Sequence, residues 1–281
     1  MPEAKPLILT AAIVGAETMR SQNPAVPYLP SEIADEAVRC WQAGVSIVHL
    51  HARNPDGSST QSAEVFGEAI RQIRAQCDII IQTSTGGAVG MSGEERCQPL
   101  TLTGELKPEM ATLSCGSVNF GEDVFLNPRP LMRDIASRIR AAGIKPELEI
   151  FDAGMMDEAA WLQKQGLIDF PAHFDFVLGV PGALAAREDA LDYLLTRLPE
   201  GSTWCVAGIG RFQLPMVEAA ARRGGNARIG FEDNIYLSKG VLAKGSWELA
   251  EAAVKIAESA GRTVATPAQA REILGIAPFR A

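Results

Sequence analysis

The sequence predicts a single-domain α/β protein over residues 1–281, folded as a (β/α)8 (TIM) barrel with a C-terminal helical tail. Three observations predict this fold. Short apolar segments typical of buried strands occur eight times, and a segment with the spacing of an amphipathic helix follows seven of them. No linker rich in proline, glycine or serine divides the chain, and its length of 281 residues suits one barrel.

The predicted strands are apolar runs that are too short for a core helix. In chain order they cover 7–12, 45–51, 79–83, 110–113, 146–152, 173–178, 203–209 and, with its exit, 227–234. Runs such as Ile79-Ile80-Ile81 are continuous rather than alternating. Continuous runs are typical of parallel strands, because both faces of a parallel sheet are covered.

The predicted helices follow seven of these strands and cover 31–43, 63–77, about 131–142, 156–165, 187–198, 213–223 and 247–260. Ser31 is expected to cap the first helix, and Gly44 to end it. The segment between the third and fourth strands contains prolines and is expected to be a loop. Residues 266–274 are expected to form the tail.

Composition excludes several classes of protein. A net charge of −8 without a cluster of Lys and Arg argues against nucleic acid as a partner. No apolar run reaches the roughly 18 residues of a membrane span, and the first residues lack a signal-peptide core, so a cytoplasmic protein without membrane contact is expected. The five cysteines form no Cys-x-x-Cys pair and are expected to be reduced and mostly buried.

The pair His49 and His51 is the strongest signal for a metal site. Side chains of a strand alternate between its faces, so these two imidazoles point the same way. The chain has three histidines, and two of them are here. A divalent metal explains the pair better than the alternative, two polar residues at a strand end. His173 is expected to be a satisfied strand histidine.

Further polar residues fall where barrel strands end at their carboxyl side, which is where the active sites of such barrels lie. They are Glu17 after strand one, Ser84 after strand three, Thr112 on strand four, Glu149 on strand five, and Arg228, Glu232 and Asp233 around strand eight. Glu232 or Asp233 is expected to be the third metal ligand, leaving an open position for substrate, as suits catalytic Zn²⁺. For Glu149, a structural ion pair and a site role are equally supported. The turn at Gly86-Gly87 is weak evidence for an anion site, and an ordinary tight turn is the favoured interpretation.

Nine segments together resemble the β-keto acid cleavage enzymes. They lie at 8–13, 15–18, 49–51, 84–88, 108–113, 176–182, 207–211, 230–234 and 265–267, and they include His49-Leu50-His51 and Gly230-Phe231-Glu232-Asp233-Asn234. The resemblance covers nearly the whole chain. It implies a zinc-dependent acyl transfer in which a β-keto acid and acetyl-CoA give acetoacetate and a new acyl-CoA. It also implies a homo-oligomer, a tetramer.

The resemblance also implies residue roles. His49, His51 and Glu232 would hold zinc, and Asp233, paired with Arg228, would act as the base. Ser84, Gly87 and Thr112 would position substrate, with Glu149 as a further site carboxylate and Glu17 at the far end of the substrate. A carboxylate there favours an ammonium group, as in 3-keto-5-aminohexanoate, whose cleavage gives 3-aminobutyryl-CoA.

Two other classes of function compete with this one. A zinc-dependent barrel lyase or aldolase would form the same enolate without CoA and remains the alternative. A non-catalytic binding protein is disfavoured, because the ligands, the base and its arginine partner are all present. Amidohydrolase-type barrels carry the His-x-His pair on the first strand and use further histidines, so they fit poorly. The sequence does not locate the CoA site.

Overall fold

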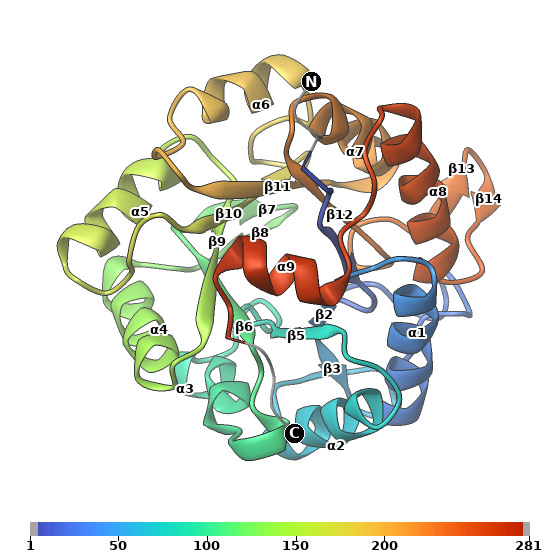
Figure 1. The fold of residues 1–281 in the computed structure, drawn as a ribbon. Coiled ribbons are helices and arrows are strands. Elements are labelled where there is room, and N and C mark those ends of the chain that lie inside the picture. The colour runs from blue at the N-terminus through green and yellow to red at the C-terminus, as the bar shows by residue number, and fades with distance from the viewer. Residues whose placement is uncertain (1–4, 278–281) are drawn as a thin grey trace.

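The computed structural model describes residues 5–277 and shows a closed barrel of parallel strands surrounded by helices (Figure 1). The barrel strands are β1 (Leu9–Ala12), β2 (Ile47–Leu50), β5 (Ile80–Thr83), β6 (Met110–Ser114), β9 (Lys145–Ile150), β10 (His173–Leu178), β11 (Thr203–Gly208) and β12 (Asn226–Ile229). Around the barrel they follow in chain order, and β12 closes on β1. The predicted fold class is confirmed.

Most of the helices pack their apolar faces on the outside of the barrel, and the last one lies across one end of it. They are α1 (Pro30–Gln42), α2 (Ala63–Arg74), α3 (Gly93–Arg96), α4 (Arg129–Ala141), α5 (Met155–Lys164), α6 (Glu188–Leu195), α7 (Gln213–Arg222), α8 (Ser246–Ser259) and α9 (Pro267–Leu274), with 3-10 turns η1 (Gln98–Thr101), η2 (Gly104–Leu106) and η3 (Gly210–Phe212). In the described range, no helix has the length and apolarity needed to cross a membrane. The five cysteines all lie in this range, are free, and four of them are buried, as expected.

Two local predictions were wrong. Ser31 does not cap α1, because the helix already begins at Pro30, whose fixed φ and missing N–H suit the first helical position. The side chain of Glu32 instead accepts the backbone N–H groups of Tyr28 and Leu29, at 2.9 Å each. The segment between the third and fourth strands is not a plain loop, since it forms α3, η1 and η2.

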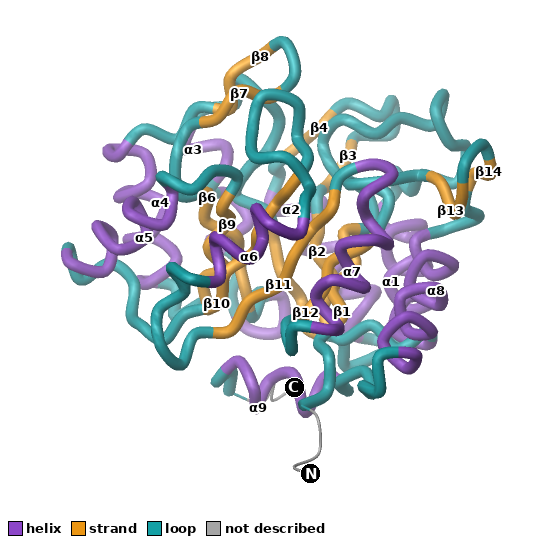
Figure 2. Tube along the Cα trace, turned by 90° about the horizontal axis from the view of Figure 1, so that it is seen from above, coloured by secondary structure: helices purple, strands orange, loops and turns teal. Residues whose placement is uncertain are grey.

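Three short hairpins extend the carboxyl ends of barrel strands and were not predicted. They are β3 (Ala52–Arg53) with β4 (Ser59–Thr60), β7 (Val118–Phe120) with β8 (Asp123–Phe125), and β13 (Tyr236–Ser238) with β14 (Val241–Leu242). Figure 2 shows β3–β4 and β7–β8 at the end of the barrel opposite α9. Of the three, the β7–β8 hairpin contributes residues to the cavity at the barrel mouth, namely Phe120, Asp123 and Phe125.

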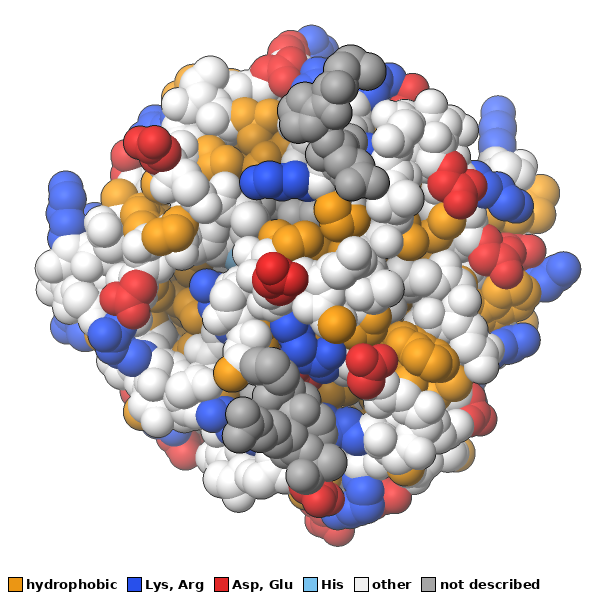
Figure 3. Space-filling view, viewed as in Figure 1, with side chains coloured by type: hydrophobic (Ala, Val, Ile, Leu, Met, Phe, Trp, Pro, Cys, Tyr) orange, Lys and Arg blue, Asp and Glu red, His pale blue; other side chains and the backbone are white. Residues whose placement is uncertain are grey.

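Helix α9 closes the other end of the barrel, where it crosses the axis in Figure 1 and covers it in Figure 3. Its apolar side chains pack on the first inward residues of the strands, and the resulting cluster consists of Ile8, Ile47, Ile80, Met110, Ala265, Ala270 and Leu274. The guanidinium of Arg271 anchors the helix by donating to Glu109 at 2.7 Å. The predicted tail therefore seals the barrel.

Above this apolar layer, the barrel interior is polar. TIM barrels are usually filled by branched aliphatic side chains. Here the buried side chains that meet across neighbouring strands are His49, Gln82, Glu147, His173, Asp175, Cys205 and Arg228. Buried polar groups are costly unless they are paired, and departures of this kind from an apolar core are typical of functional sites.

Candidate active site

An open cavity of about 430 Å³ lies at the carboxyl ends of the strands, as expected. It brings together most of the residues predicted for the site, namely Glu17, His51, Ser84, Gly87, Glu149, Arg228, Glu232 and Asp233. His49 and Thr112 are not part of its lining and lie just below it. The barrel mouth thus collects side chains that are more than 200 positions apart in the chain.

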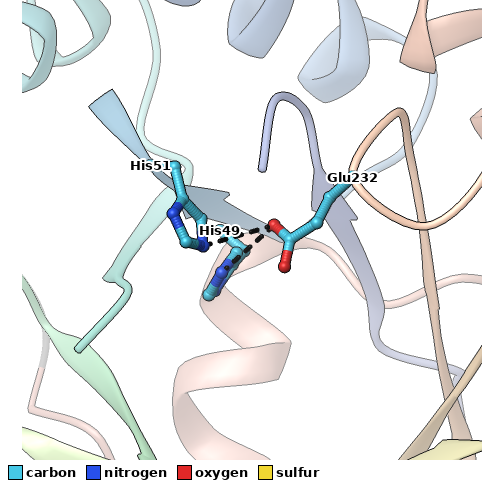
Figure 4. A group of neighbouring side chains, drawn as sticks. All are labelled: His49, His51 and Glu232. Carbon is cyan, nitrogen blue, oxygen red and sulfur yellow. Dashed lines mark ion pairs between the residues drawn. The ribbon is translucent and has the colours of Figure 1, made fainter. Parts of the chain in front are cut away.

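Three potential ligand atoms converge on one point beside this cavity (Figure 4). The Oε2 atom of Glu232 lies 3.4 Å from Nε2 of His49 and 3.6 Å from Nε2 of His51. His49 is at the strand position that pairs with Gln82, and its Nδ1 contacts the Gln82 side-chain oxygen at 2.8 Å. A contact of this kind orients an imidazole with its other nitrogen free for a metal.

The separations of these atoms fit a bound ion. With bonds of about 2.0–2.1 Å, two ligand atoms of a tetrahedral ion lie roughly 3.3 Å apart. Among the described residues, His49 Nε2 and Glu232 Oε2 have no hydrogen-bond partner, although both are buried. Buried polar atoms usually have a partner, and these two face one another without one. A cation bound between them would interact with both. The donor set therefore fits a divalent metal.

The protonation states agree with this interpretation. Burial lowers the pKa of His51 to about 4 and also lowers the pKa of His49, so both imidazoles are neutral at pH 7. Burial raises the pKa of Glu232, but Arg228 and the two histidines outweigh it and bring this pKa down to about 2. Neutral imidazoles and an ionised carboxylate are the forms of these side chains that bind a metal.

The position of Glu232 depends on a close approach by the β1 loop. Gly15 has a φ of +57°, and a Cβ atom built there would lie 2.6 Å from Cγ of Glu232. Strand β12 has ended at Ile229, and Gly230, with a φ of +129°, turns the chain back toward β1. Only glycine provides both the space and the backbone conformation at position 15.

Gly15→Ala is therefore expected to push Glu232 away from the histidines and to lower metal affinity about 10-fold or more. Metal titration of the folded variant measures this. Gly166→Ala is the matched control, because Gly166 has a φ of +68° and an added Cβ would meet no atom within 4 Å. Equal metal affinity in the two variants would show that the contact between position 15 and Glu232 does not set metal affinity.

Arg228 holds the two adjacent acids in different orientations. Its Nε and Nη2 donate to the two oxygens of Asp233, at 2.9 Å each, and Nη2 also donates to Oε1 of Glu232 at 2.6 Å. The guanidinium is almost fully buried, and its two carboxylate partners compensate for its charge. As a result Glu232 faces the histidines, while Asp233 lines the cavity.

Two carboxyl groups of the cavity wall have raised pKa values. Burial raises the pKa of Asp233 to about 6, against the lowering effect of Arg228. Burial also raises the pKa of Glu149 to about 7, again opposed by Arg228. Glu149 accepts a hydrogen bond from the Ser114 hydroxyl at 2.6 Å and lies 3.8 Å from Arg228. Perturbed carboxyl groups in a cavity are typical of sites that move protons.

The turn after β5 forms the opposite wall. The hydroxyl of Ser84 accepts the backbone N–H of Gly86 at 3.0 Å, and Gly87 lines the cavity with a φ of +63°. Thr112 lies behind this wall, fully buried, where its hydroxyl accepts the N–H of Thr85 at 3.3 Å. In this arrangement Thr112 supports the turn from below.

Glu17 stands at the outer part of the cavity, and its side chain is exposed. Within residues 5–277 its carboxylate has no hydrogen bond or ion pair of its own. The loop that carries it is held by the buried guanidinium of Arg53, which donates to the carbonyls of Gly15 at 2.8 Å and Thr18 at 2.9 Å. Sequence reasoning missed Arg53, although it follows the histidine pair closely in the chain.

Comparison with known proteins identifies the family of this chain. The family model described as beta-keto acid cleavage enzyme matches residues 6–276. The chain belongs to the β-keto acid cleavage enzyme family. The resemblance expected from its motifs is thereby confirmed.

Known enzymes are similar to this chain over nearly their whole length. The chain is 52% identical to the 3-keto-5-aminohexanoate cleavage enzyme of Fusobacterium nucleatum, over 96% of this chain and 98% of that enzyme. It is 39% identical to the 3-oxoadipate:acetyl-CoA acetyltransferase of Cupriavidus necator, over 97% of this chain and 95% of that enzyme.

The solved apo structure of ObcA has the same fold, with a TM-score of 0.80 at 21% identity. The match covers 90% of this chain and 66% of ObcA. At this identity the likeness supports the barrel alone.

Proposed function

We propose that this β-keto acid cleavage enzyme uses zinc to convert 3-keto-5-aminohexanoate, or a closely related acid, and acetyl-CoA into acetoacetate and an acyl-CoA, here 3-aminobutyryl-CoA. The observation that carries the proposal is the convergence of His49, His51 and Glu232 beside the Arg228–Asp233 pair in one cavity. The similarity to the Fusobacterium nucleatum enzyme supports the substrate. The name of the Cupriavidus necator enzyme supports acetyl-CoA as co-substrate.

His49, His51 and Glu232 are the residues that would hold the metal. Two imidazoles and one carboxylate with a position left open are typical of catalytic zinc. Bound there, zinc would supply a Lewis acid that polarises the ketone of the substrate. Because Glu232 is also bonded to Arg228, its carboxylate is fixed before any metal arrives.

Asp233 is the proposed base for the first step. It would remove a proton from the carbon between the ketone and the carboxylate of the substrate, a carbon made acidic by both groups. The two hydrogen bonds from Arg228 fix the plane of the Asp233 carboxylate. This orientation matters because proton transfer requires the base within about 3 Å of the carbon-bound proton or of a bridging water.

The remaining steps exchange two acyl groups. The deprotonated carbon attacks the acetyl carbonyl of acetyl-CoA, and CoA leaves as a thiolate. The thiolate then attacks the ketone of the original acid, and the bond between that ketone and the neighbouring carbon breaks. The fragment that carries the carboxylate takes a proton and leaves as acetoacetate, while the rest of the substrate leaves as the new acyl-CoA.

Ser84, Gly87, Thr112 and Glu149 are proposed to position the substrate. Ser84 and Gly87 border the cavity opposite Asp233, and Thr112 supports their turn through Thr85. Glu149, with its raised pKa, is proposed as the further site carboxyl group that exchanges protons with the bound intermediates.

Glu17→Gln is expected to lower kcat/KM for 3-keto-5-aminohexanoate about 10- to 100-fold, because a charge-assisted hydrogen bond to the substrate ammonium group is lost. The neutral analogue 3-ketohexanoate should change little. Steady-state kinetics with both acids measure the difference. Glu122→Gln is the control, since Glu122 is an exposed acid near the cavity but outside its lining. An equal loss with both substrates would give Glu17 a structural role instead.

The reaction is tested by assaying zinc-loaded protein with cationic, neutral and dicarboxylic β-keto acids, each with and without acetyl-CoA, and measuring acetoacetate. Acetoacetate that depends on acetyl-CoA and forms fastest from 3-keto-5-aminohexanoate supports the proposal. Preference for another β-keto acid would support the proposed reaction but with a different substrate. Cleavage without acetyl-CoA would favour the zinc-dependent lyase or aldolase.

Assembly, domain structure and location are also proposed. We expect a cytoplasmic homotetramer of single-domain subunits. The exposed apolar side chains of the β13–β14 hairpin, Tyr236, Val241 and Leu242, offer a surface for subunit contact. Light scattering on the purified protein measures the number of subunits, and one cooperative unfolding transition is expected for a single domain.

A further inference from the structure

We propose a second metal site, buried inside the barrel, in which Glu147, His173 and Cys205 bind a divalent cation such as zinc. It lies one layer nearer to the amino ends of the strands than the cavity, since Glu147 comes two residues before Glu149 on β9. The proposal is independent of the reaction proposed above. It concerns side chains to which that reaction gives no role.

The three side chains come from three neighbouring strands. Glu147 on β9 is in register with His173 on β10, and Cys205 follows on β11. Their potential ligand atoms all lie within 4.8 Å of one another. Glu147 is completely buried, and His173 and Cys205 are each 1% exposed. A carboxylate, an imidazole and a thiol in this proximity are a set that binds zinc.

Several buried atoms of this cluster and of the neighbouring Asp175 lack hydrogen bonds in the part of the chain that the structure describes. Among the described residues, neither oxygen of Glu147 has a hydrogen-bond partner, and neither has Nε2 of His173. The same is true of Oδ2 of Asp175, whose other oxygen accepts from Sγ of Cys205 at 3.1 Å. Leaving such buried groups unsatisfied costs free energy, and a cation among them would satisfy them together.

His173 is oriented in the same way as His49 in the first site. Nδ1 of His173 contacts the Thr203 hydroxyl at 2.8 Å, as Nδ1 of His49 contacts Gln82. Nε2 of His173 then faces Oε2 of Glu147 at 3.3 Å, and Nε2 of His49 faces Oε2 of Glu232 at 3.4 Å. Both separations match the roughly 3.3 Å expected between ligands of a tetrahedral ion.

The charges also balance. Binding would displace the proton of the Cys205 thiol, so one carboxylate, one thiolate and one neutral imidazole would surround a divalent ion with no net charge. Asp175 lies beside this set and is not part of it, since its Oδ1 accepts from Sγ of Cys205 and its Oδ2 lies 3.5 Å from Nη1 of Arg228. With three protein ligands, the fourth position of a tetrahedral ion would be taken by a water molecule.

The competing explanation is an ion pair between a protonated His173 and Glu147, without any metal. The two explanations predict different metal contents. We therefore expect protein produced in zinc-supplemented medium to contain two zinc ions per chain by elemental analysis. His51→Ala should contain one, and Cys205→Ser should also contain one. One zinc in the wild-type protein and none in His51→Ala would overturn the proposal.

Cobalt distinguishes the two sites by their ligands. Only the second site contains sulfur, so only Co²⁺ bound there gives sulfur-to-cobalt charge-transfer absorption in the near ultraviolet. We expect this band in wild-type protein grown with cobalt and in His51→Ala, and its loss in Cys205→Ser. Cys40→Ser is the control, because Cys40 is equally buried but lies on α1, outside the barrel. If Cys205→Ser fails to fold, the spectra of the wild-type protein and His51→Ala still test the second site. Absence of the band in both proteins would reject it.

Discussion

His51→Ala is expected to empty the catalytic metal site and to lower kcat/KM on the order of 10³-fold or more. The variant loses one of three ligand atoms, the Nε2 atom that lies 3.6 Å from the shared Glu232 oxygen. Removal also leaves Glu232 and His49 facing one another without the metal between them. Turnover assays, together with the metal content of the purified variant, measure both effects.

Gln82→Leu provides a graded comparison for this prediction. Gln82 contacts His49 at 2.8 Å but does not line the cavity, so its loss should weaken metal binding by about 10- to 100-fold without abolishing it. Full activity should return at high zinc concentration in Gln82→Leu and not in His51→Ala. A His51→Ala protein with wild-type zinc affinity at the mouth would contradict the ligand set.

Asp233→Asn is expected to keep the metal and to lower kcat about 10²- to 10⁴-fold, the range for loss of a general base. Asparagine has the same shape and still accepts one hydrogen bond from Arg228, so the local structure should persist. Exchange of the substrate proton with deuterated water, followed without acetyl-CoA, isolates the step in which Asp233 acts.

The control for this variant is Asp123→Asn. Asp123 also lines the cavity, but it lies on the β7–β8 hairpin and forms no bond with Arg228. Its replacement should leave deuterium exchange nearly unchanged. If Asp233→Asn exchanges the proton as fast as the wild-type enzyme, another group is the base, and Glu149 becomes the first candidate because it lines the same cavity.

The order of elements and most of the site were predictable from local patterns. Continuous apolar runs identify parallel strands, and the spacing of His49 and His51 places both imidazoles on one side of β2. Because parallel strands of a barrel end at one mouth, polar residues at strand ends could be grouped without any contact information. Most of these residues do line one cavity.

Other features depend on contacts between distant segments, which no local pattern contains. Glu232 and Asp233 are equivalent as neighbours in the chain, so local patterns left both open as the third ligand, and within the sequence only the family resemblance favoured Glu232. The turn at Gly230 and the close approach of Gly15 direct Glu232 toward the histidines. Arg228 binds Asp233 by donating hydrogen bonds to its carboxylate. Arg53 likewise had no periodic signal, because its three backbone partners lie in loops.

The amino-acid sequence by itself therefore determined the barrel, its family and the residue types at its mouth, because periodicity and strand ends are local properties. The three-dimensional packing of the chain determined which acid faces the histidines. It also placed Glu147, His173 and Cys205 together, although they lie on separate strands and had no pattern in common. Burial supplies the physical reason, since it makes each charge depend on the partners that the fold brings to it.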